Sequence, residues 1–281
     1  MTQARVIDLV TDAAKTRAGI GAFNVIQLEL AEAIVEGAEM AGRPTILQIS
    51  QNCVLYHGSL APIASASLAL ARQSEQPIGV NLDHATEPSL VAEALDLGID
   101  SVMFDASTLS DQANRASTAA VVAMCHRRGV SVEAELGEIG GKDGVHAPGA
   151  RTDPEQAAAF VEATGVDALA VAVGSSHGMT RRTAALDFDL IAALRAKVPV
   201  PLVLHGSSGV ADADLAKAVT AGLTKINIGT LLNQTLTESI RATLANNPAM
   251  VNTRKYLGPA RRAVAQVVAG LIGLLAGGVK P

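Results

Sequence analysis

Short apolar runs alternate along most of the chain with longer segments of helical periodicity. The apolar runs fall at residues 20–25, 45–50, 78–82, 101–104, 130–136, 168–173, 201–205 and 224–228. Between them lie Ala- and Leu-rich stretches at 28–41, 88–97, 111–127, 153–163, 187–196 and 212–221, and several of these begin with Asp or Pro, which favour helix starts. The pattern predicts eight strand–helix units.

Eight such units within 281 residues favour a closed (β/α)8 TIM barrel of the α/β class over an open doubly wound sheet. We expect a single barrel domain spanning residues 1–281, with a C-terminal helical extension. The most apolar segment, residues 263–279, is interrupted by Gln266 and glycines and is shorter than the ~20 residues of a membrane-spanning helix. It is therefore expected to be a packed terminal helix or a subunit contact.

Polar side chains gather at the ends of the predicted strands. In a (β/α)8 barrel the chemistry lies at the C-terminal ends of the strands, whereas polar residues at random positions would divide between both ends. The pattern therefore predicts one active-site face. Its candidates are Asn24, Ser50, Asp83, His84, Asp105, Glu135, His177, His205 and Asn227.

Three of the six histidines, His84, His177 and His205, follow the third, sixth and seventh predicted strands. Neutral imidazole is the commonest protein ligand of zinc, and a catalytic zinc keeps three protein ligands and one open position. One such histidine alone would more often be bonded to a backbone carbonyl. Three at separate strand exits favour a shared metal ion.

Carboxylates accompany these histidines. Asp83 directly precedes His84, where it could cap a helix, but a carboxylate beside a metal ligand is also well placed for proton transfer. Glu133 and Glu135 alternate along the fifth strand and so point to one face, where they need a cation, an Arg or a Lys nearby.

Glycine-bearing turns follow the last three strands, at residues 174–178, 205–209 and 227–230. Glycine lets backbone N–H groups approach an anion closely, and the last strands of a barrel with the next helix N-terminus are a usual phosphate site. Three successive turns therefore predict a phosphate cradle rather than simple tight turns.

Composition narrows the classes of function. A hydrophobic content of 49% supports a large core, and a net charge of −5 without a basic block argues against binding nucleic acid or an anionic membrane. Cys53 and Cys125 provide no disulfide framework, and no secretory signal pattern is visible. We expect a cytoplasmic protein.

In their order and combination these pieces resemble the class II, zinc-dependent ketose-bisphosphate aldolases, which include fructose- and tagatose-bisphosphate aldolases. The resemblance runs through almost the whole chain. The matching segments are residues 22–25, 82–84, 101–105, 132–137, 140–141, 167–178, 204–206, 225–227 and 254–257.

The resemblance implies a Zn²⁺ ion held by His84, His177 and His205. It also implies Asp83 as the acid/base on the aldehyde-derived oxygen and Asn227 as a residue that helps to hold the enediolate. Zinc would polarise the ketone as a Lewis acid, which spares the enzyme a Schiff-base lysine.

Further residues are expected to bind substrate or cations. Arg254 is expected to reach the distal phosphate across a subunit interface, with a surface salt bridge as the alternative. Asp105 and Glu135 are candidates for a secondary metal, and a monovalent cation is a candidate near the phosphate site. The resemblance also implies that the phosphate of the dihydroxyacetone phosphate moiety is bound by Gly178, Arg181, Gly206, Ser208 and Thr230. Asn24 and Ser50 are further candidates for binding substrate.

Several positions depart from the family pattern. Arg181 stands where Lys is common, Leu231 stands where an acidic residue is common, and the turn at 205–209 has Ser where a second Gly is usual. The glycine-rich loop after strand five lacks the family's glutamate base. We expect Asp143 to replace it, with Glu138 as the alternative.

These features predict a lyase that cleaves a ketose 1,6-bisphosphate, most simply fructose 1,6-bisphosphate, to dihydroxyacetone phosphate and an aldehyde such as glyceraldehyde 3-phosphate. We expect a homo-oligomer, either a dimer or a tetramer. A tagatose-bisphosphate aldolase and a metal-dependent sugar-phosphate isomerase or epimerase stay open as alternatives. A non-enzymatic subunit of an aldolase complex is disfavoured because the metal triad and Asp83 are both present.

Overall fold

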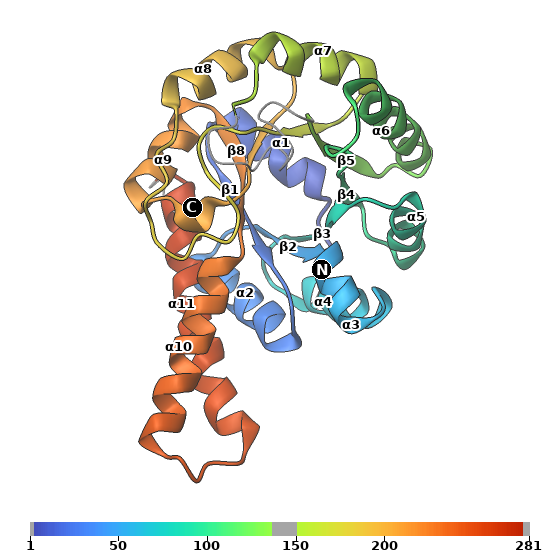
Figure 1. Ribbon diagram of the computed structural model, residues 1–281. Coiled ribbons are helices and arrows are strands. Elements are labelled where there is room, and N and C mark those ends of the chain that lie inside the picture. The colour runs from blue at the N-terminus through green and yellow to red at the C-terminus, as the bar shows by residue number, and fades with distance from the viewer. Residues whose placement is uncertain (1–2, 137–150, 278–281) are drawn as a thin grey trace.

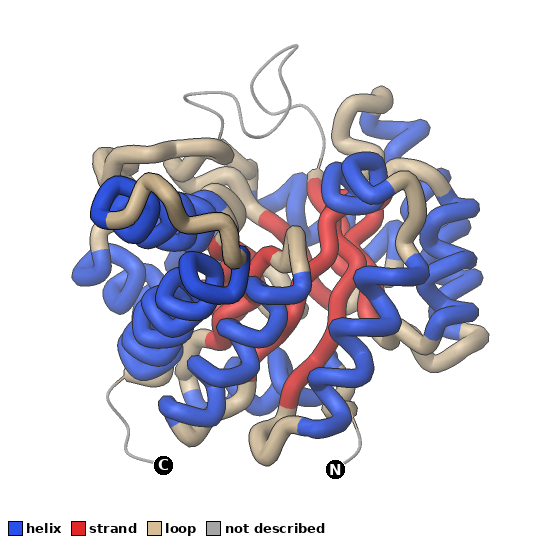
Figure 2. The backbone as a smooth tube through the Cα atoms, turned by 90° about the horizontal axis from the view of Figure 1, so that it is seen from below, coloured by secondary structure: helices blue, strands red, loops and turns tan. Residues whose placement is uncertain are grey.

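The computed structural model describes residues 3–136 and 151–277. Within them, eight parallel strands close into a barrel in sequential order, and helices surround it (Figures 1 and 2). The predicted (β/α)8 barrel is confirmed. The strands are β1 (Ile20–Asn24), β2 (Thr45–Ser50), β3 (Ile78–Ala85), β4 (Ser101–Phe104), β5 (Ser131–Glu135), β6 (Ala168–Ala170), β7 (Leu202–Leu204) and β8 (Leu223–Ile228).

The helices comprise those at the ranges given above and four more, α1, α3, α4 and α10. The eight strand–helix units imply helices after β2 and β8, whereas α1 precedes the first unit and was not predicted. Their bounds are α1 (Val6–Thr16), α2 (Leu28–Ala41), α3 (Gln51–His57), α4 (Ala61–Gln73), α5 (Pro88–Leu97), α6 (Asp111–His126), α7 (Pro154–Thr164), α8 (Phe188–Lys197), α9 (Asp212–Ala221), α10 (Thr230–Asn246) and α11 (Thr253–Leu275), with a 3-10 turn, η1, at Ser207–Gly209.

Strand β3 continues past its predicted end. The pair Asp83-His84 was expected to follow the strand, but β3 runs to Ala85. The reason is an irregularity: the register between β3 and β4 shifts between Leu82 and Ala85, so pairing resumes beyond the two polar residues. Asp83 and His84 therefore lie within a strand.

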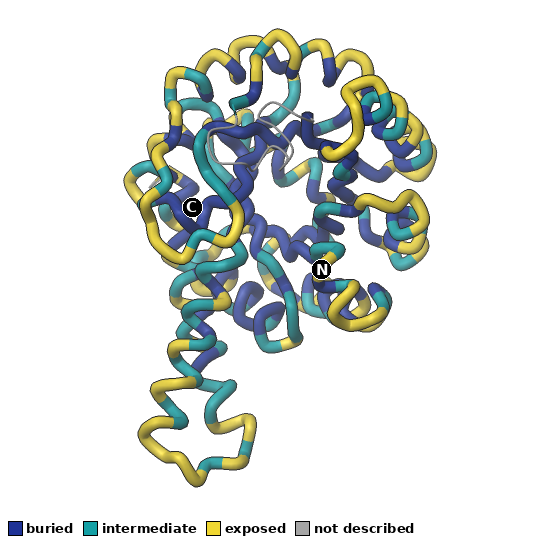
Figure 3. The backbone as a smooth tube through the Cα atoms, in the orientation of Figure 1, coloured by how far each residue is buried: buried dark blue, intermediate teal, exposed yellow. Residues whose placement is uncertain are grey.

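Helices α10 and α11 form a hairpin that projects from the barrel (Figure 1). The base of α11 packs on α2, where Gly37 permits a close approach: an added Cβ would lie 2.7 Å from Val268 Cβ. The tip of the hairpin is exposed (Figure 3), and Val251 there is 90% exposed. The apolar segment at residues 263–279 contributes to α11, which begins earlier than that segment, at Thr253.

The barrel interior contains polar side chains as well as aliphatic ones. Asn24, Gln48 and Asn81 lie in register on β1, β2 and β3, and their amides form a chain of hydrogen bonds with N···O distances of 3.3 Å. Gln48 and Asn81 are fully buried. Because barrel interiors are usually filled by branched aliphatic residues, this polar chain marks a face adapted to polar ligands.

Among the helices that the structure describes, none is by itself long and apolar enough to cross a membrane. Helices α3 and α4 meet that test only when taken together, and they are bent by 119°.

Candidate functional site

Three imidazoles converge at the C-terminal end of the barrel. One ring nitrogen from each of His84, His177 and His205 lies within 4.8 Å of the others. Their ring centroids are 4.8 to 5.6 Å apart, with interplanar angles of 71° to 80°. Three imidazole nitrogens around one point are the donor set of a catalytic zinc site.

The irregularity in β3 places two consecutive residues in the same site. Successive side chains of a regular strand point to opposite faces, yet Asp83 and His84 both line one pocket. His84 has a left-handed backbone with φ of 50°, which is unfavourable for a residue with a Cβ. Bulges of this kind redirect side chains near active sites.

Hydroxyl groups connect the loops that carry the other two histidines. Ser175 Oγ donates to the carbonyl oxygen of His205 at 2.6 Å, which joins the β6 loop to the end of β7. Ser207 Oγ donates to the carbonyl oxygen of Asn227. The loops after β6 and β7 and the end of β8 are therefore held as one unit.

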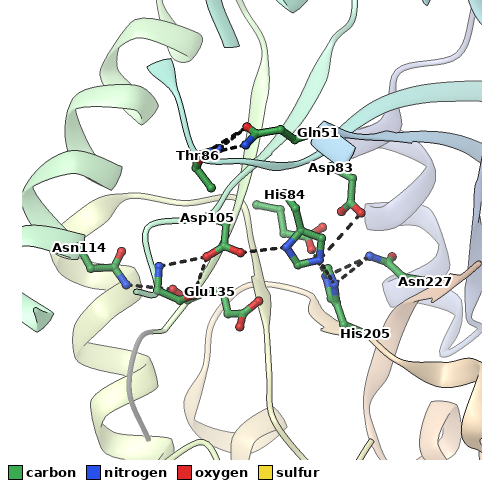
Figure 4. A network of polar contacts seen from close by, with 11 residues as sticks. Gln51, Asp83, His84, Thr86, Asp105, Asn114, Glu135, His205 and Asn227 are labelled. Atoms are coloured by element: carbon green, nitrogen blue, oxygen red, sulfur yellow. Dashed lines mark hydrogen bonds and ion pairs between the residues drawn. The ribbon is translucent and has the colours of Figure 1, made fainter. Parts of the chain in front are cut away.

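His84 is the centre of the polar network (Figure 4). Its Nδ1 lies 2.9 Å from Asp105 Oδ2, and its Nε2 lies 3.0 Å from His205 Nδ1. Burial by itself lowers the pKa of His84, but the charges of Asp83 and Asp105 outweigh it and raise the pKa to about 10. A hydrogen bond between the two nitrogens needs one proton, and a divalent ion bound by both would take the place of that proton.

Asp83 is a buried carboxyl group at the edge of the histidine cluster. It is 2% exposed, and its Oδ2 lies 4.0 Å from His84 Nε2. Burial raises the pKa of Asp83, and the charges of His84 and Lys225 oppose that rise. Its Oδ1 has no hydrogen-bond partner within the described residues, and neither has Asn227 Oδ1. Two buried acceptors that line a pocket indicate a polar ligand.

A second set of possible metal ligands adjoins the first. His84, Asp105 and Glu135 each offer one atom within 4.8 Å of the others. Burial would raise the pKa of Asp105, but hydrogen bonds with His84 and Ser107 hold that pKa well below its usual range. The pKa of Glu135 is raised well above its usual value by burial and then by the charge of Asp105. A cation here would relieve the repulsion between these carboxylates.

The opposite side of the pocket is built from backbone turns and a helix start. Gly206, Ser208 and Thr230 line it, and α10 begins at Thr230. Ser208 Oγ accepts from the backbone N–H of Leu231 at 3.1 Å, which fixes the β7 loop against the first turn of α10. A helix N-terminus with glycine-bearing turns is suited to bind phosphate.

Gly206 is a position where a larger residue should damage the site. Its φ is +67°, and an added Cβ would lie 2.5 Å from the carbonyl carbon of Ser176 and 3.0 Å from His177 N. A misplacement of about 1 Å can cost ~10²-fold in rate, so Gly206→Ala is expected to lower kcat/KM by that order. Steady-state assays of fructose 1,6-bisphosphate cleavage measure this.

The matched control is Gly42→Ala at the end of α2, because Gly42 has a similar φ of +63° and no atom within 4 Å of an added Cβ. It carries the left-handed strain of about 1–2 kcal/mol without touching the site. Its kcat/KM should equal that of the wild type. Equal losses in the two variants would contradict the positioning role of Gly206.

The structure gathers most of the predicted site residues around one pocket of about 480 Å³. Glu135 contributes to the adjoining acidic cluster. Arg181 is exposed and does not line this pocket. Arg254 lies in the first turn of α11, where it contacts Asn252. The predicted residues that line the pocket are Asn24, Ser50, Asp83, His84, Asp105, His177, Gly178, His205, Gly206, Ser208, Asn227 and Thr230.

Several pocket residues were not predicted. Gln51 and Asn52 directly follow β2, and Thr86 directly follows β3, so the strand-exit rule would have included them. Gln51 also accepts from the backbone N–H of Thr86 at 2.8 Å, which joins the two loops. Asn233 lies one turn into α10 and carries no sequence signal of its own. Asp143 and Glu138 lie outside the described residues.

Comparisons with known proteins agree with this geometry. The family described as "Fructose-bisphosphate aldolase class-II" matches residues 4–277. A "Probable fructose-bisphosphate aldolase" of Bacillus subtilis (strain 168) is 39% identical over 255 residues, which covers 89% of this chain and 90% of the relative.

Solved structures of aldolases are also similar to this chain. The YdjI aldolase of Escherichia coli K12 has 31% identity and a TM-score of 0.87, with full coverage of both chains. A putative fructose-1,6-biphosphate aldolase of Coccidioides immitis has 29% identity and a TM-score of 0.83, with 96% coverage of both. The fructose-bisphosphate aldolase of Campylobacter jejuni, at 22% identity and a TM-score of 0.80 over 96% of this chain and 93% of that one, supports the fold alone.

Proposed function

Because the chain belongs to the class II fructose-bisphosphate aldolase family and is an aldolase, we propose that it cleaves fructose 1,6-bisphosphate reversibly at a zinc site formed by His84, His177 and His205. The products are dihydroxyacetone phosphate and glyceraldehyde 3-phosphate. The observation that carries the proposal is the convergence of three imidazoles beside the buried carboxyl group of Asp83.

The donor set fits zinc, since three nitrogen ligands with room for substrate are typical of catalytic zinc. Zinc, when bound, would supply Lewis-acid stabilisation of the negative charge that develops on the substrate oxygens. Asp105 accepts from His84 Nδ1 and so directs the other ring nitrogen toward the site. Asp105 and Glu135 are proposed to bind a secondary cation.

Asp83 is proposed to move the proton of the cleavage step. In the cleavage direction, Asp83 takes the proton from the C4 hydroxyl group, and C4 becomes the carbonyl carbon of the aldehyde. The C3–C4 bond breaks, and the electron pair of that bond stays on C3, in the part that becomes dihydroxyacetone phosphate. The raised pKa of Asp83 suits a group that must both accept and return this proton. Asn227 lines the same pocket and is proposed to donate its amide to the substrate oxygens.

The carbon left with the electron pair must then gain a proton. We assign this step to Asp143, with Glu138 as the alternative, in the segment after β5. The phosphate of dihydroxyacetone phosphate is placed against the first turn of α10, with a monovalent cation nearby. The pocket residues proposed to bind the substrate are Asn24, Ser50, Gly178, Gly206, Ser208 and Thr230. Arg181, which does not line the pocket, is proposed to reach the phosphate from the segment after β6.

Arg254 is proposed to bind the distal phosphate of a substrate held by a second copy of the chain. Within the described residues it forms no ion pair, and it lies at the start of α11, next to the turn between α10 and α11, rather than at its own pocket. A homo-oligomer, a dimer or tetramer, follows from this role. We also place the protein in the cytoplasm, in keeping with its two buried free cysteines, and propose no nucleic-acid or membrane partner.

The decisive assay offers fructose 1,6-bisphosphate and tagatose 1,6-bisphosphate to the zinc-loaded protein and detects triose phosphate. We expect cleavage of both to depend on zinc, with the higher kcat/KM for the fructose compound. Preference for the tagatose compound would reassign the substrate. Conversion of a sugar monophosphate without carbon–carbon cleavage would support an isomerase or epimerase instead.

A further inference from the structure

A buried lysine and a buried glutamate form a chain of contacts that ends on one of the zinc-site histidines. Lys225 Nζ donates to Glu133 Oε2 at 2.8 Å, and Glu133 Oε1 lies 2.9 Å from His205 Nε2. The three residues are only 1 to 4% exposed. Because β5 and β8 are not neighbours in the barrel, the contact between Glu133 and Lys225 crosses the barrel interior. Neither residue has a part in the function proposed above.

We propose that Glu133, oriented by Lys225, is a positioning residue that keeps the His205 proton on Nε2 and so leaves Nδ1 as the metal-binding nitrogen. The inference rests on the proposed zinc site. A neutral imidazole carries one proton, and an ionised carboxylate can only accept, so the nitrogen facing Glu133 must donate. The other nitrogen, Nδ1, lies 3.0 Å from His84 Nε2, on the side where the three imidazoles converge.

The neighbouring amide of Asn227 opposes Glu133 at this nitrogen. Asn227 Nδ2 lies 3.0 Å from His205 Nε2 and 3.4 Å from Nδ1, and an amide nitrogen only donates, so it would require a lone pair on the nitrogen that it faces. Glu133 Oε1 lies closer to Nε2, at 2.9 Å, and a hydrogen bond to a charged carboxylate is about twice as strong as one between neutral groups, so the proton stays on Nε2. Carboxylate partners of this kind fix the tautomer and orientation of metal-bound histidines in many proteins.

Lys225 explains why the carboxylate is needed. An ammonium group has donors and no acceptor, so whichever atom of residue 133 faces it must be an acceptor. The carboxylate of Glu133 also compensates the positive charge of Lys225, which would otherwise be buried without a partner. In Glu133→Gln, the amide oxygen would face Lys225 and the amide NH₂ would face His205. The NH₂ group would then require a lone pair on Nε2, which moves the His205 proton to Nδ1, into the metal site.

Glu133→Gln is nearly isosteric, so its effect can be attributed to the tautomer. We expect it to raise the zinc dissociation constant, measured by competition with a chromophoric chelator, by about 10 to 100-fold. Adding Lys225→Met should restore most of the affinity, because the amide is then free to turn its oxygen toward Nε2. Wild-type affinity in Glu133→Gln, or no recovery in the double variant, would overturn the inference.

The control is Asp167→Asn, since Asp167 Oδ2 lies 2.8 Å from His126 Nε2 in a similar pair outside the site. It should leave zinc affinity unchanged, and an equal loss there would overturn the specific role of Glu133.

A second measurement uses only the wild-type protein, so it is unaffected if a variant folds poorly. Long-range ¹H–¹⁵N spectra of the zinc-loaded wild-type protein, with ¹⁵N-labelled histidine, should show His205 protonated at Nε2 and metal-bound through Nδ1. Zinc bound through Nε2 would overturn this inference while leaving the proposed function intact. Failure of the protein to bind zinc at all would instead refute the proposed function.

Discussion

His177→Ala is expected to abolish stoichiometric zinc binding and to lower kcat for fructose 1,6-bisphosphate cleavage by at least about 10³-fold. The metal's contribution to transition-state stabilisation is several kcal/mol, and each 1.36 kcal/mol is a tenfold change in rate. His177 is the exposed member of the triad, so its removal leaves the buried core intact. Metal analysis measures the zinc content, circular dichroism checks the fold, and steady-state kinetics give kcat.

His126→Ala is the control for this substitution. His126 is also exposed, but it pairs with Asp167 at the end of α6 rather than with the site. Its zinc content and kcat should equal those of the wild type. A His177→Ala protein that retained one tightly bound zinc and normal turnover would remove His177 from the ligand set.

Asp83→Asn is expected to lower kcat by at least about 10²-fold while one zinc stays bound, because a positioned proton-transfer group contributes 10²- to 10⁴-fold. The asparagine side chain that replaces the carboxyl group would have nearly the same shape, but an amide does not accept and return a proton near neutral pH. Binding of a dihydroxyacetone phosphate analogue should survive. Kinetics, metal analysis and calorimetry of the analogue separate these effects.

The matched control for Asp83→Asn lies outside the pocket. Burial also raises the pKa of Asp100, to about 6, and Asp100 accepts from the backbone N–H of Val6 at the start of α1. Asp100→Asn should therefore leave kcat unchanged. Loss of zinc or of folding in Asp83→Asn would show that Asp83 is structural.

Much of the fold was predictable because barrel strands have a strong local signature. Apolar runs alternating with Asp- and Pro-initiated helices identify the βα units, and active-site residues follow the strands. From their positions alone, that rule predicted His84, His177 and His205, which the structure brings together. It could not identify the irregularity in β3, since the left-handed backbone at His84 depends on pairing with β4 rather than on the local sequence.

Contacts across the barrel were not predictable in detail. The sequence indicated that Glu133 needs a cationic partner. Lys225 is 92 residues away along the chain, and the distance between its ammonium group and the Glu133 carboxylate depends on how the barrel closes. The positions of the Arg181 and Arg254 side chains were not predictable either. Their positions in the sequence match the family, but this does not determine where such long side chains lie. Neither residue lines the pocket that the other candidates share.

The most direct test of the account is a zinc titration of metal-stripped protein, with cleavage of fructose 1,6-bisphosphate measured at each step. Activity should be absent without metal and should rise in proportion to bound zinc until the catalytic site is filled, and borohydride added with substrate should trap no adduct. Full cleavage by metal-free protein, or a trapped substrate adduct on Lys225, would contradict the metal-based account and indicate a Schiff-base mechanism.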